Sequence, residues 1–221
     1  MVDLGPTAWP DVPVDGTTLL LPLGATEQHG PHLPIDTDTR IAAEWCRRAA
    51  HGRVDVVVAP ALPYGSSGEH SDFPGTLSIG TAVLADLLVE LVRSAVPPHR
   101  RVVIVNGHGG NHEAVVAAVE QSVADGRDVR AVWPQLPGDA HAGRTETSLL
   151  LAIAPDVVDM ERAVAGTTTP IRELLPSLQR DGLRTHSSTG ILGDPTGASA
   201  EEGQRLWERL RQQLVGVLDG S

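Results

Sequence analysis

The segment between residues 24 and 38 holds an unusual density of side chains that bind cations or move protons: two histidines and three acidic residues. Glu27 and His29 are two positions apart, so in an extended segment their side chains project to the same side. Together with Asp38, at the expected start of a helix, they form a mixed oxygen and nitrogen set that suits zinc, manganese or ferrous iron. The alternative is that Asp36 or Asp38 caps the helix and His29 is a surface loop residue. The concentration of such groups directly after a predicted strand favours the metal interpretation.

A second polar segment, from Asn106 to Glu113, turns from a buried strand into a helix. Its glycines let the backbone approach a site closely, which places His108 well for binding. A phosphate-binding loop is the alternative, but the full dinucleotide fingerprint is absent and no acidic residue ends the following strand. His112 and Glu113 fit the first turn of the helix, so we leave them outside the predicted site.

The third segment, from Asp139 to Ser148, contains His141 and Glu146 and leads into an apolar helix. Glu146 is a candidate ligand, although Thr145 or Glu146 could instead serve as a helix N-terminal cap. His141 is a candidate proton carrier, and its alternative is a structural histidine with satisfied hydrogen bonds. The residues alone leave both alternatives open.

The elements that must position these segments follow from the alternation of short β-branched or leucine-rich runs with longer helical patterns, each switch marked by Gly, Pro or Asn. The predicted strands are Thr18–Leu23, Val54–Ala59, Arg101–Asn106 and Val129–Trp133. The predicted helices are Thr39–Ala50, Thr81–Ala95, Asn111–Ala124, Glu146–Ala154 and Ala200–Leu218.

The continuously apolar run Val102–Val105 is typical of a strand covered by helices on both faces. Right-handed crossovers through the intervening helices make such a sheet mostly parallel. The sequence therefore predicts an α/β fold, a three-layer α/β/α sandwich, as one domain over residues 1–221. Ligands in such folds gather beyond the carboxyl ends of the strands, where the first two polar segments lie. Two long loops, 60–80 and 182–199, are expected to be functional or mobile.

The composition excludes several classes of function. A net charge of −11 repels nucleic acid and anionic membranes. All 17 basic residues are arginine, which excludes a lysine nucleophile. A single cysteine, Cys46, permits no internal disulfide and predicts a reducing compartment, with the cytoplasm as the expected location. No export signal or membrane span is indicated.

The order of the three segments resembles the creatininase family, whose members carry a Glu-x-His-Gly-x-His…Asp segment, an Asn-Gly-His loop and a His-x-Gly-x-x-Glu-Thr-Ser segment. Pro74-Gly75-Thr76 and Gly193-Asp194-Pro195 also match the family, so the resemblance covers nearly the whole chain. It implies a two-metal amidohydrolase in which Glu27 and His108 bind one ion, His29 binds the other and Asp38 bridges them. The two divalent ions are expected to be Fe2+, Zn2+ or Mn2+, and to activate water for amide hydrolysis.

One position departs from the family pattern. Members that open creatinine have Tyr-Glu after the loop histidine, whereas this chain has Gly109 and Gly110, so a carboxylate ligand is missing. We assign its role to Glu146 as a hypothesis. His141 matches the family's acid/base histidine and is expected to move the proton from water to the departing nitrogen.

Other mechanisms are less well supported. Ser187 and Ser188 follow His186, but no Gly-x-Ser-x-Gly elbow is present and the loop lacks a paired acid. Cys46 lies within a helix and is expected to be a packing residue. An alternative of another class is a metal-binding regulatory or assembly subunit without turnover.

The substrate is expected to be a peptide. Creatinine-cleaving members hold their substrate with aromatic residues, including a Trp shortly before the acid/base histidine, and Pro137–Ala140 contains none. An aromatic cage would need Trp133. The segments 139–148 and 185–195 are most similar to those of family members in the mycofactocin system, peptidases that release the modified C-terminal Val-Tyr unit from a precursor peptide. The alternatives are a formamide hydrolase of flavin or deazaflavin biosynthesis and a creatinine amidohydrolase. The resemblance also implies a homo-oligomer, with a hexamer as one possibility.

Overall fold

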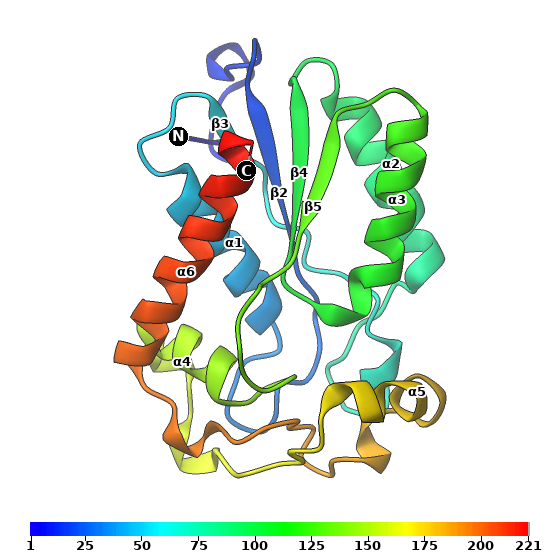
Figure 1. The fold of residues 1–221 in the computed structure, drawn as a ribbon, viewed down its shortest axis with the longest axis vertical. Helices are drawn as coiled ribbons and strands as arrows, with labels where there is room; N and C mark the ends of the chain where they lie inside the picture. The colour runs from blue at the N-terminus through cyan, green and yellow to red at the C-terminus, as the bar shows by residue number, and fades with distance from the viewer. Residues whose placement is uncertain (221) are drawn as a thin grey trace.

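The computed structural model describes residues 1–220 and contains a five-stranded sheet in the order β1-β3-β2-β4-β5, with every pairing parallel (Figure 1). The strands are β1 (Val2–Asp3), β2 (Thr18–Leu23), β3 (Val56–Val58), β4 (Arg101–Asn106) and β5 (Val129–Val132). The chain moves outward from β2 to β3 and then returns to the opposite side of β2 to form β4. The boundary between β2 and β4 is therefore the point where the direction of winding changes, which is where open α/β sheets bind ligands.

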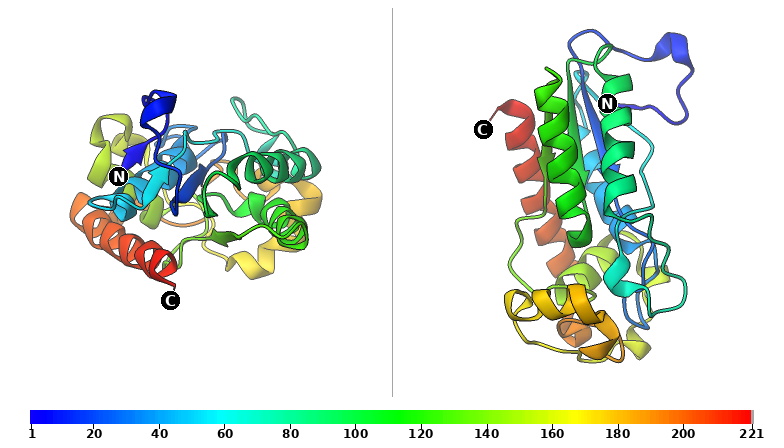
Figure 2. Two further views of the ribbon diagram at one scale, coloured as in Figure 1. Left: turned by 90° about the horizontal axis from the view of Figure 1, so that it is seen from above. Right: turned by 90° about the vertical axis from the view of Figure 1, so that its right-hand side faces the viewer.

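Helices cover both faces of the sheet (Figures 1 and 2). They are α1 (Thr37–Ala50), α2 (Thr81–Ala95), α3 (His112–Ala124), α4 (Arg144–Ile153), α5 (Ile171–Asp181) and α6 (Ala200–Asp219). Short 3-10 helices span Trp9–Asp11, Gly68–His70, Gly109–Asn111, Pro155–Val157, Met160–Arg162, Leu183–Thr185 and Pro195–Gly197.

The side chains of β2 alternate between the two faces, as the period of two along a strand requires. Leu20 packs in one buried cluster with Trp45 of α1 and Trp207 of α6. Leu19 and Leu21 pack in a second cluster, which contains residues of α2 and α3. The sheet is thus the middle layer of a three-layer α/β/α sandwich, and the predicted fold class is confirmed.

The strands Thr18–Leu23 and Arg101–Asn106 and the helix Thr81–Ala95 have the predicted bounds, and the other predicted elements differ by up to two residues at an end. Helix α5 was not predicted, because Pro176 lies inside it and proline disfavours a helix interior. Leu174 and Leu178 of α5 pack in a small cluster with Leu183, and this burial offsets the effect of the proline. The two-residue strand β1 is too short to give a pattern.

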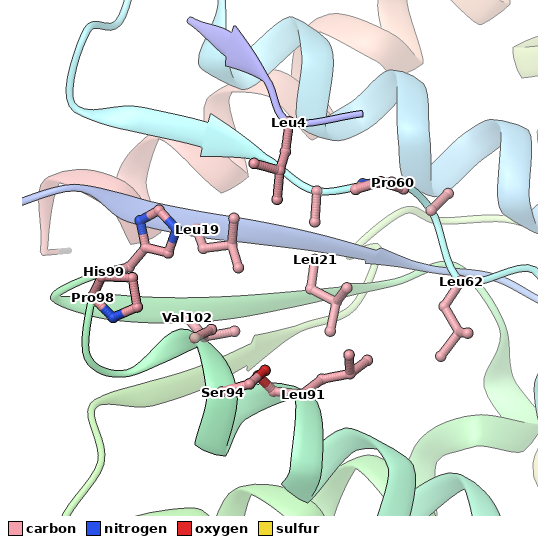
Figure 3. A pocket seen from close by; sticks show the side chains of 13 residues that line it. Leu4, Leu19, Leu21, Pro60, Leu62, Leu91, Ser94, Pro98, His99 and Val102 are labelled. Atoms are coloured by element: carbon pink, nitrogen blue, oxygen red, sulfur yellow. The ribbon is translucent and has the colours of Figure 1, made fainter. Parts of the chain in front are cut away.

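A cavity of about 420 Å³ lies against the face of the sheet that carries Leu19 and Leu21, and its wall is mostly apolar, with Ser94 and His99 as its polar side chains (Figure 3). Leu4, Pro60, Leu62, Leu91 and Val102 also line it. The cavity wall contains neither the predicted metal ligands nor His141. Among the described residues, no helix is long and apolar enough to span a membrane.

Candidate metal centre

The predicted site residues meet because the loops that follow β2 and β4 begin side by side. The last residues of the two strands, Leu23 and Asn106, are partners in the sheet register. Asn111 ties the loops together: its Nδ2 donates to the main-chain oxygen of Gly24 (3.0 Å) and to the side-chain oxygen of Asn106 (3.0 Å), and its Oδ1 accepts from the N–H of Ser66 (2.8 Å). Three loops that are distant in sequence are therefore fixed at one edge of the sheet.

Two sets of possible ligands share Asp38. Glu27, Asp38 and His108 place one donor atom each within 4.8 Å of one another, and His29, Asp38 and Glu146 do the same. His29 Nε2 lies 3.0 Å from Asp38 Oδ1, and His108 Nδ1 lies 3.3 Å from Asp38 Oδ2. His108 Nε2 is 3.1 Å from Glu27 Oε2, and His29 Nε2 is 3.9 Å from Glu146 Oε2. The structure thus brings together all five residues that the sequence predicted as ligands.

The hydrogen bonding of this cluster fits a bound cation. Glu27 has 0% exposed surface, and both of its carboxylate oxygens lack a hydrogen-bond partner among the described residues, as does Oδ2 of Asp38. A buried carboxylate without such partners is costly in free energy. Mixed carboxylate and imidazole ligands around divalent ions would remove that cost, so the residues present fit a divalent metal centre.

The pKa shifts within the cluster also fit a bound cation. Burial lowers the pKa of His29, but the charge and hydrogen bond of Asp38 outweigh it and raise that pKa to about 10. Burial also opposes the charged form of His108, yet Glu27 and Asp38 raise its pKa well above the usual value. Burial raises the pKa of Glu146 to about 7. The carboxylates of Glu27 and Asp38 thus stabilise positive charge within the buried cluster.

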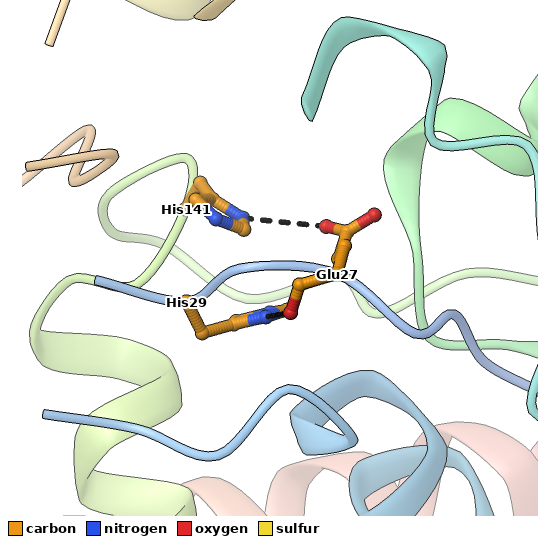
Figure 4. A group of neighbouring side chains, drawn as sticks. All are labelled: Glu27, His29 and His141. Carbon is orange, nitrogen blue, oxygen red and sulfur yellow. Dashed lines mark hydrogen bonds and ion pairs between the residues drawn. The ribbon is translucent and has the colours of Figure 1, made fainter. Parts of the chain in front are cut away.

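His141 lies beside the same cluster, and its ring points toward Glu27 (Figure 4). Its Nδ1 is 3.8 Å from Glu27 Oε1, and its ring centroid is 4.3 Å from that of His29. Nε2 lies 2.9 Å from the main-chain oxygen of Gln28, an acceptor, and 3.0 Å from the side-chain amide nitrogen of Gln28. In the tautomer with the hydrogen on Nε2, this hydrogen is donated to the main-chain oxygen and Nδ1 presents its lone pair to the site. Burial lowers the pKa of His141 well below its usual value, and the neighbouring His29 acts in the same direction.

The segment 182–199 holds His141 in place. The backbones of His141 and Leu192 form an antiparallel bridge, with hydrogen bonds in both directions. Gln28 Nε2 donates to the main-chain oxygen of Gly190 (3.1 Å), and a Cβ at Gly190 would lie 1.9 Å from Gln28 Oε1. Because Gly190 also has φ +78°, a larger residue there would strain the backbone and displace Gln28. This loop is part of the wall of the site.

Sequence reasoning left open the role of the loop 60–80, which proves to contribute to the site. His70 is buried, and its Nε2 lies 3.3 Å from Glu27 Oε1. Its Nδ1 is 3.0 Å from Gln28 Nε2. Glu69 Oε1 is 3.8 Å from His108 Nε2. Tyr64, by contrast, is exposed.

Other residues considered in the sequence lie away from the cluster. His112 and Glu113 are exposed on the first turn of α3, and the ring of Trp133 packs against His112 with centroids 5.1 Å apart. Cys46 is buried in α1, and burial raises the pKa of its thiol, which disfavours a nucleophilic thiolate. Ser187 contacts Thr189 through its hydroxyl.

Comparison with known proteins gives consistent results. The family model described as "Creatininase: Creatinine amidohydrolase" matches residues 7–218. The mycofactocin precursor peptide peptidase of Mycobacterium ulcerans (strain Agy99) is 50% identical over 224 residues, covering 96% of this chain and 89% of that protein. The protein of the same name from Mycolicibacterium smegmatis (strain ATCC 700084 / mc(2)155) is 52% identical over 198 residues, covering 87% and 80%. A solved mutant creatininase of the Zn-Zn type has a TM-score of 0.84 at 28% identity, covering 98% of this chain and 96% of that chain.

Proposed function

The chain belongs to the creatininase family, and from that membership and the buried cluster of acids and imidazoles we propose that it is the peptidase that cleaves a mycofactocin precursor peptide. It is a hydrolase acting on amide or peptide bonds. The bond we assign to it is the one whose hydrolysis releases the modified C-terminal Val-Tyr unit. The observation that carries this assignment is the identity of 50% to the Mycobacterium ulcerans peptidase across 96% of the chain.

The proposed centre holds two divalent ions. Glu27, Asp38 and His108 would hold the first, and His29, Asp38 and Glu146 would hold the second, with Asp38 shared by both sets. When bound, the ions would lower the pKa of water and polarise the target carbonyl. Fe2+, Zn2+ and Mn2+ all suit these ligands.

The remaining chemistry falls to His141. Its Nδ1 lone pair faces Glu27, because Nε2 donates its hydrogen to the Gln28 main chain. Nδ1 accepts a proton as the water oxygen bonds to the carbonyl carbon. It then returns that proton to the amide nitrogen as the carbon–nitrogen bond breaks. Burial lowers the pKa of His141, so its imidazole is neutral and its Nδ1 lone pair is not already protonated.

The assembly and the location of the protein are also proposals. Family resemblance favours a homo-oligomer, with a hexamer as one possibility, and the single Cys46 favours a reducing compartment such as the cytoplasm. Light scattering of the purified protein measures the oligomeric state. Fractionation of the cells that produce the protein identifies its compartment.

The decisive experiment compares substrates. Protein reconstituted with Fe2+, Zn2+ or Mn2+ is incubated with the crosslinked precursor peptide, with a formamidopyrimidine and with creatinine, and products are identified by mass spectrometry. We expect release of the Val-Tyr unit that stops with a chelator and returns with metal. Hydrolysis of the formamide or of creatinine, with the peptide left intact, would assign one of the other family activities. Peptide binding without turnover would identify a non-catalytic subunit.

A further inference from the structure

The side-chain amide of Gln28 has a fixed orientation. Its Oε1 accepts the N–H of Gly30 (2.8 Å), and its Nε2 donates to the main-chain oxygen of Gly190 (3.1 Å). A backbone donor on one side and a backbone acceptor on the other are satisfied by one orientation only, so the amide nitrogen faces Gly190. This nitrogen has one further hydrogen to donate. Two imidazoles lie within its reach, since His70 Nδ1 and His141 Nε2 are each 3.0 Å away.

The second hydrogen of the Gln28 amide goes to His70. His141 Nε2 also faces the main-chain oxygen of Gln28 (2.9 Å), which can only accept, so a hydrogen on His141 Nε2 satisfies this oxygen. His70 Nδ1 has no hydrogen-bond partner among the described residues other than the amide nitrogen. It therefore accepts the hydrogen from Gln28, and the hydrogen of the His70 ring is on Nε2.

The surroundings of His70 Nε2 agree with this tautomer. Nε2 lies 3.3 Å from Glu27 Oε1 and 3.9 Å from Glu69 Oε1, and carboxylate oxygens attract an N–H and repel a lone pair. Glu27 Oε1 nonetheless has no aligned hydrogen-bond donor in the described part of the chain. His70, which is 5% exposed, thus presents a buried N–H to the centre, and no acceptor within residues 1–220 is aligned with it.

His70 and His141 lie side by side and present opposite groups to the centre. Their ring centroids are 4.6 Å apart. His70 Nε2 and His141 Nδ1 lie 3.3 Å and 3.8 Å from the same atom, Glu27 Oε1, so a hydrogen and a lone pair face one place. Amide hydrolysis uses one of each: a base for the proton of water, and a donor for the carbonyl oxygen, which becomes negative as the water oxygen bonds to the carbon.

We propose that His70 is a catalytic residue whose Nε2–H donates a hydrogen bond to the oxygen of the scissile carbonyl, and that Gln28 is the positioning residue that holds His70 in this tautomer. The inference rests on the proposed function, because it assigns a further residue to the same hydrolysis.

The His70 hydrogen stays on its ring throughout the reaction. As the water oxygen bonds to the carbonyl carbon, the π electron pair moves onto the carbonyl oxygen, and the His70 N–H stabilises the charge that develops there. This pair then re-forms the carbonyl as the carbon–nitrogen bond breaks. The departing nitrogen takes the proton that His141 removed from water.

The test compares His70→Ala with the matched control His51→Ala, an exposed histidine at the end of α1, in protein loaded with Zn2+. Removal of one donor to the developing charge should lower kcat on the crosslinked precursor peptide by roughly 10²- to 10³-fold. KM and metal content are expected to match the control, because the lost interaction forms only as the charge develops.

A phosphinic analogue of the precursor peptide gives a second measurement. Its tetrahedral phosphorus replaces the scissile carbonyl and carries a negative oxygen like the one that forms during hydrolysis. The affinity of His70→Ala for this analogue should fall by the same factor as kcat/KM, whereas its affinity for the released product should match the control. A residue that only supports the fold would not separate these two affinities.

The outcomes distinguish the role of His70 from the proposed function. Turnover by His70→Ala equal to that of the control would overturn the role of His70 and leave the proposed function standing. Loss of metal from this variant would also overturn it and would assign His70 to the metal centre. A wild type that leaves the precursor peptide intact would overturn the proposed function.

Neutron diffraction from crystals of the deuterated, Zn2+-loaded wild type tests the tautomer without any variant or substrate. We expect deuterium on Nε2 of both His70 and His141. Deuterium on Nδ1 of His70, with none on Nε2, would overturn the proposal. This measurement decides the matter if circular dichroism shows that His70→Ala is unfolded, and it does so whichever amide the protein cleaves.

Discussion

At the scale of single residues, Asp38 is the side chain on which the cluster depends. It is 1% exposed and lies within 3.3 Å of a ring nitrogen of both His29 and His108. Those imidazoles hold its pKa well below the usual range, although burial opposes them. Its two oxygens face different partners, which is the arrangement a bridging ligand needs.

Glu146 offers a test of the second ion. We expect Glu146→Gln to lose about one ion per subunit and to lower peptide hydrolysis by a factor of roughly 10² or more, since an amide is a weaker ligand for a divalent ion than a carboxylate. Metal content and turnover are measured on the same preparation. Full retention of both would remove Glu146 from the site.

For His141, unlike Glu146, we expect a substitution to lower activity without loss of metal. Because its Nδ1 is proposed to move a proton and not to bind metal, His141→Ala should lower kcat by roughly 10²- to 10⁴-fold with the metal content unchanged. Metal analysis and steady-state kinetics check this. Since Glu27, His29 and His141 also form a possible ligand set, loss of an ion together with activity would identify His141 as a ligand instead.

The sequence indicated much of the cluster but not all of it. Glu27, His29 and His108 directly follow strands with strong apolar patterns, so their common edge could be predicted. Glu69 could not be, since nothing in the loop 60–80 itself shows that it folds back onto the site. Its position depends on the contact of Ser66 with Asn111, residues that are distant in the chain.

At the scale of secondary structure, some elements form where the local sequence pattern predicts them, whereas others depend on tertiary packing. The strands β2 and β4 were predictable because each contains an uninterrupted apolar run, Leu19–Leu21 and Val102–Val105, which is typical of a strand covered by helices on both faces. Helix α5 was not, because Pro176 contradicts a helix locally and only the packing of Leu174 and Leu178 against Leu183 and Leu192 stabilises it.

Glu146 lies in helix α4, and the packing of α4 against α6 fixes the position of the backbone that carries it. A Cβ at Gly203 of α6 would lie 1.9 Å from the main-chain oxygen of Ser148 in α4. We expect Gly203→Ala to separate the two helices and to lower the free energy of unfolding by about 1–3 kcal/mol, the usual effect of overpacking. Urea unfolding followed by circular dichroism measures it.

The matched control for that variant is Arg209→Ala, at an exposed position of α6. Its substitution removes a surface side chain and should change stability by no more than about 0.5 kcal/mol. If Gly203→Ala proves as stable as this control, the two helices are farther apart than the structure places them.

At the scale of the whole molecule, the site occupies the boundary between β2 and β4, where the winding of the sheet reverses. The loops after these two strands part toward opposite sides of the sheet, and the space between them is where the side chains meet. The proposed ligands come from residues 27 to 146, so only the folded chain assembles them.

Because of this dispersal, we expect the stability of the protein to depend on metal. An ion that binds the folded chain at a concentration of 100 times its Kd stabilises it by about 2.7 kcal/mol, provided that the unfolded chain does not bind it. For a chain of 221 residues that corresponds to a rise in Tm of roughly 5–11 °C. Removing the ions leaves Glu27 and Asp38 as buried, incompletely paired carboxylates, so we expect the metal-free protein to melt at the lower temperature.

Differential scanning calorimetry of metal-free protein, with and without Zn2+ or Mn2+, measures this shift. Mg2+ serves as the control ion, since it prefers all-oxygen ligands and keeps its water molecules, and it should raise Tm much less at a site with two imidazoles. The Asp38→Asn variant, which removes the shared ligand, should lose the response to both transition metals. A wild-type Tm that is the same with and without these ions would mean that the buried carboxylates are stabilised by protons or by the neighbouring imidazoles alone, and that the cluster is not a metal centre.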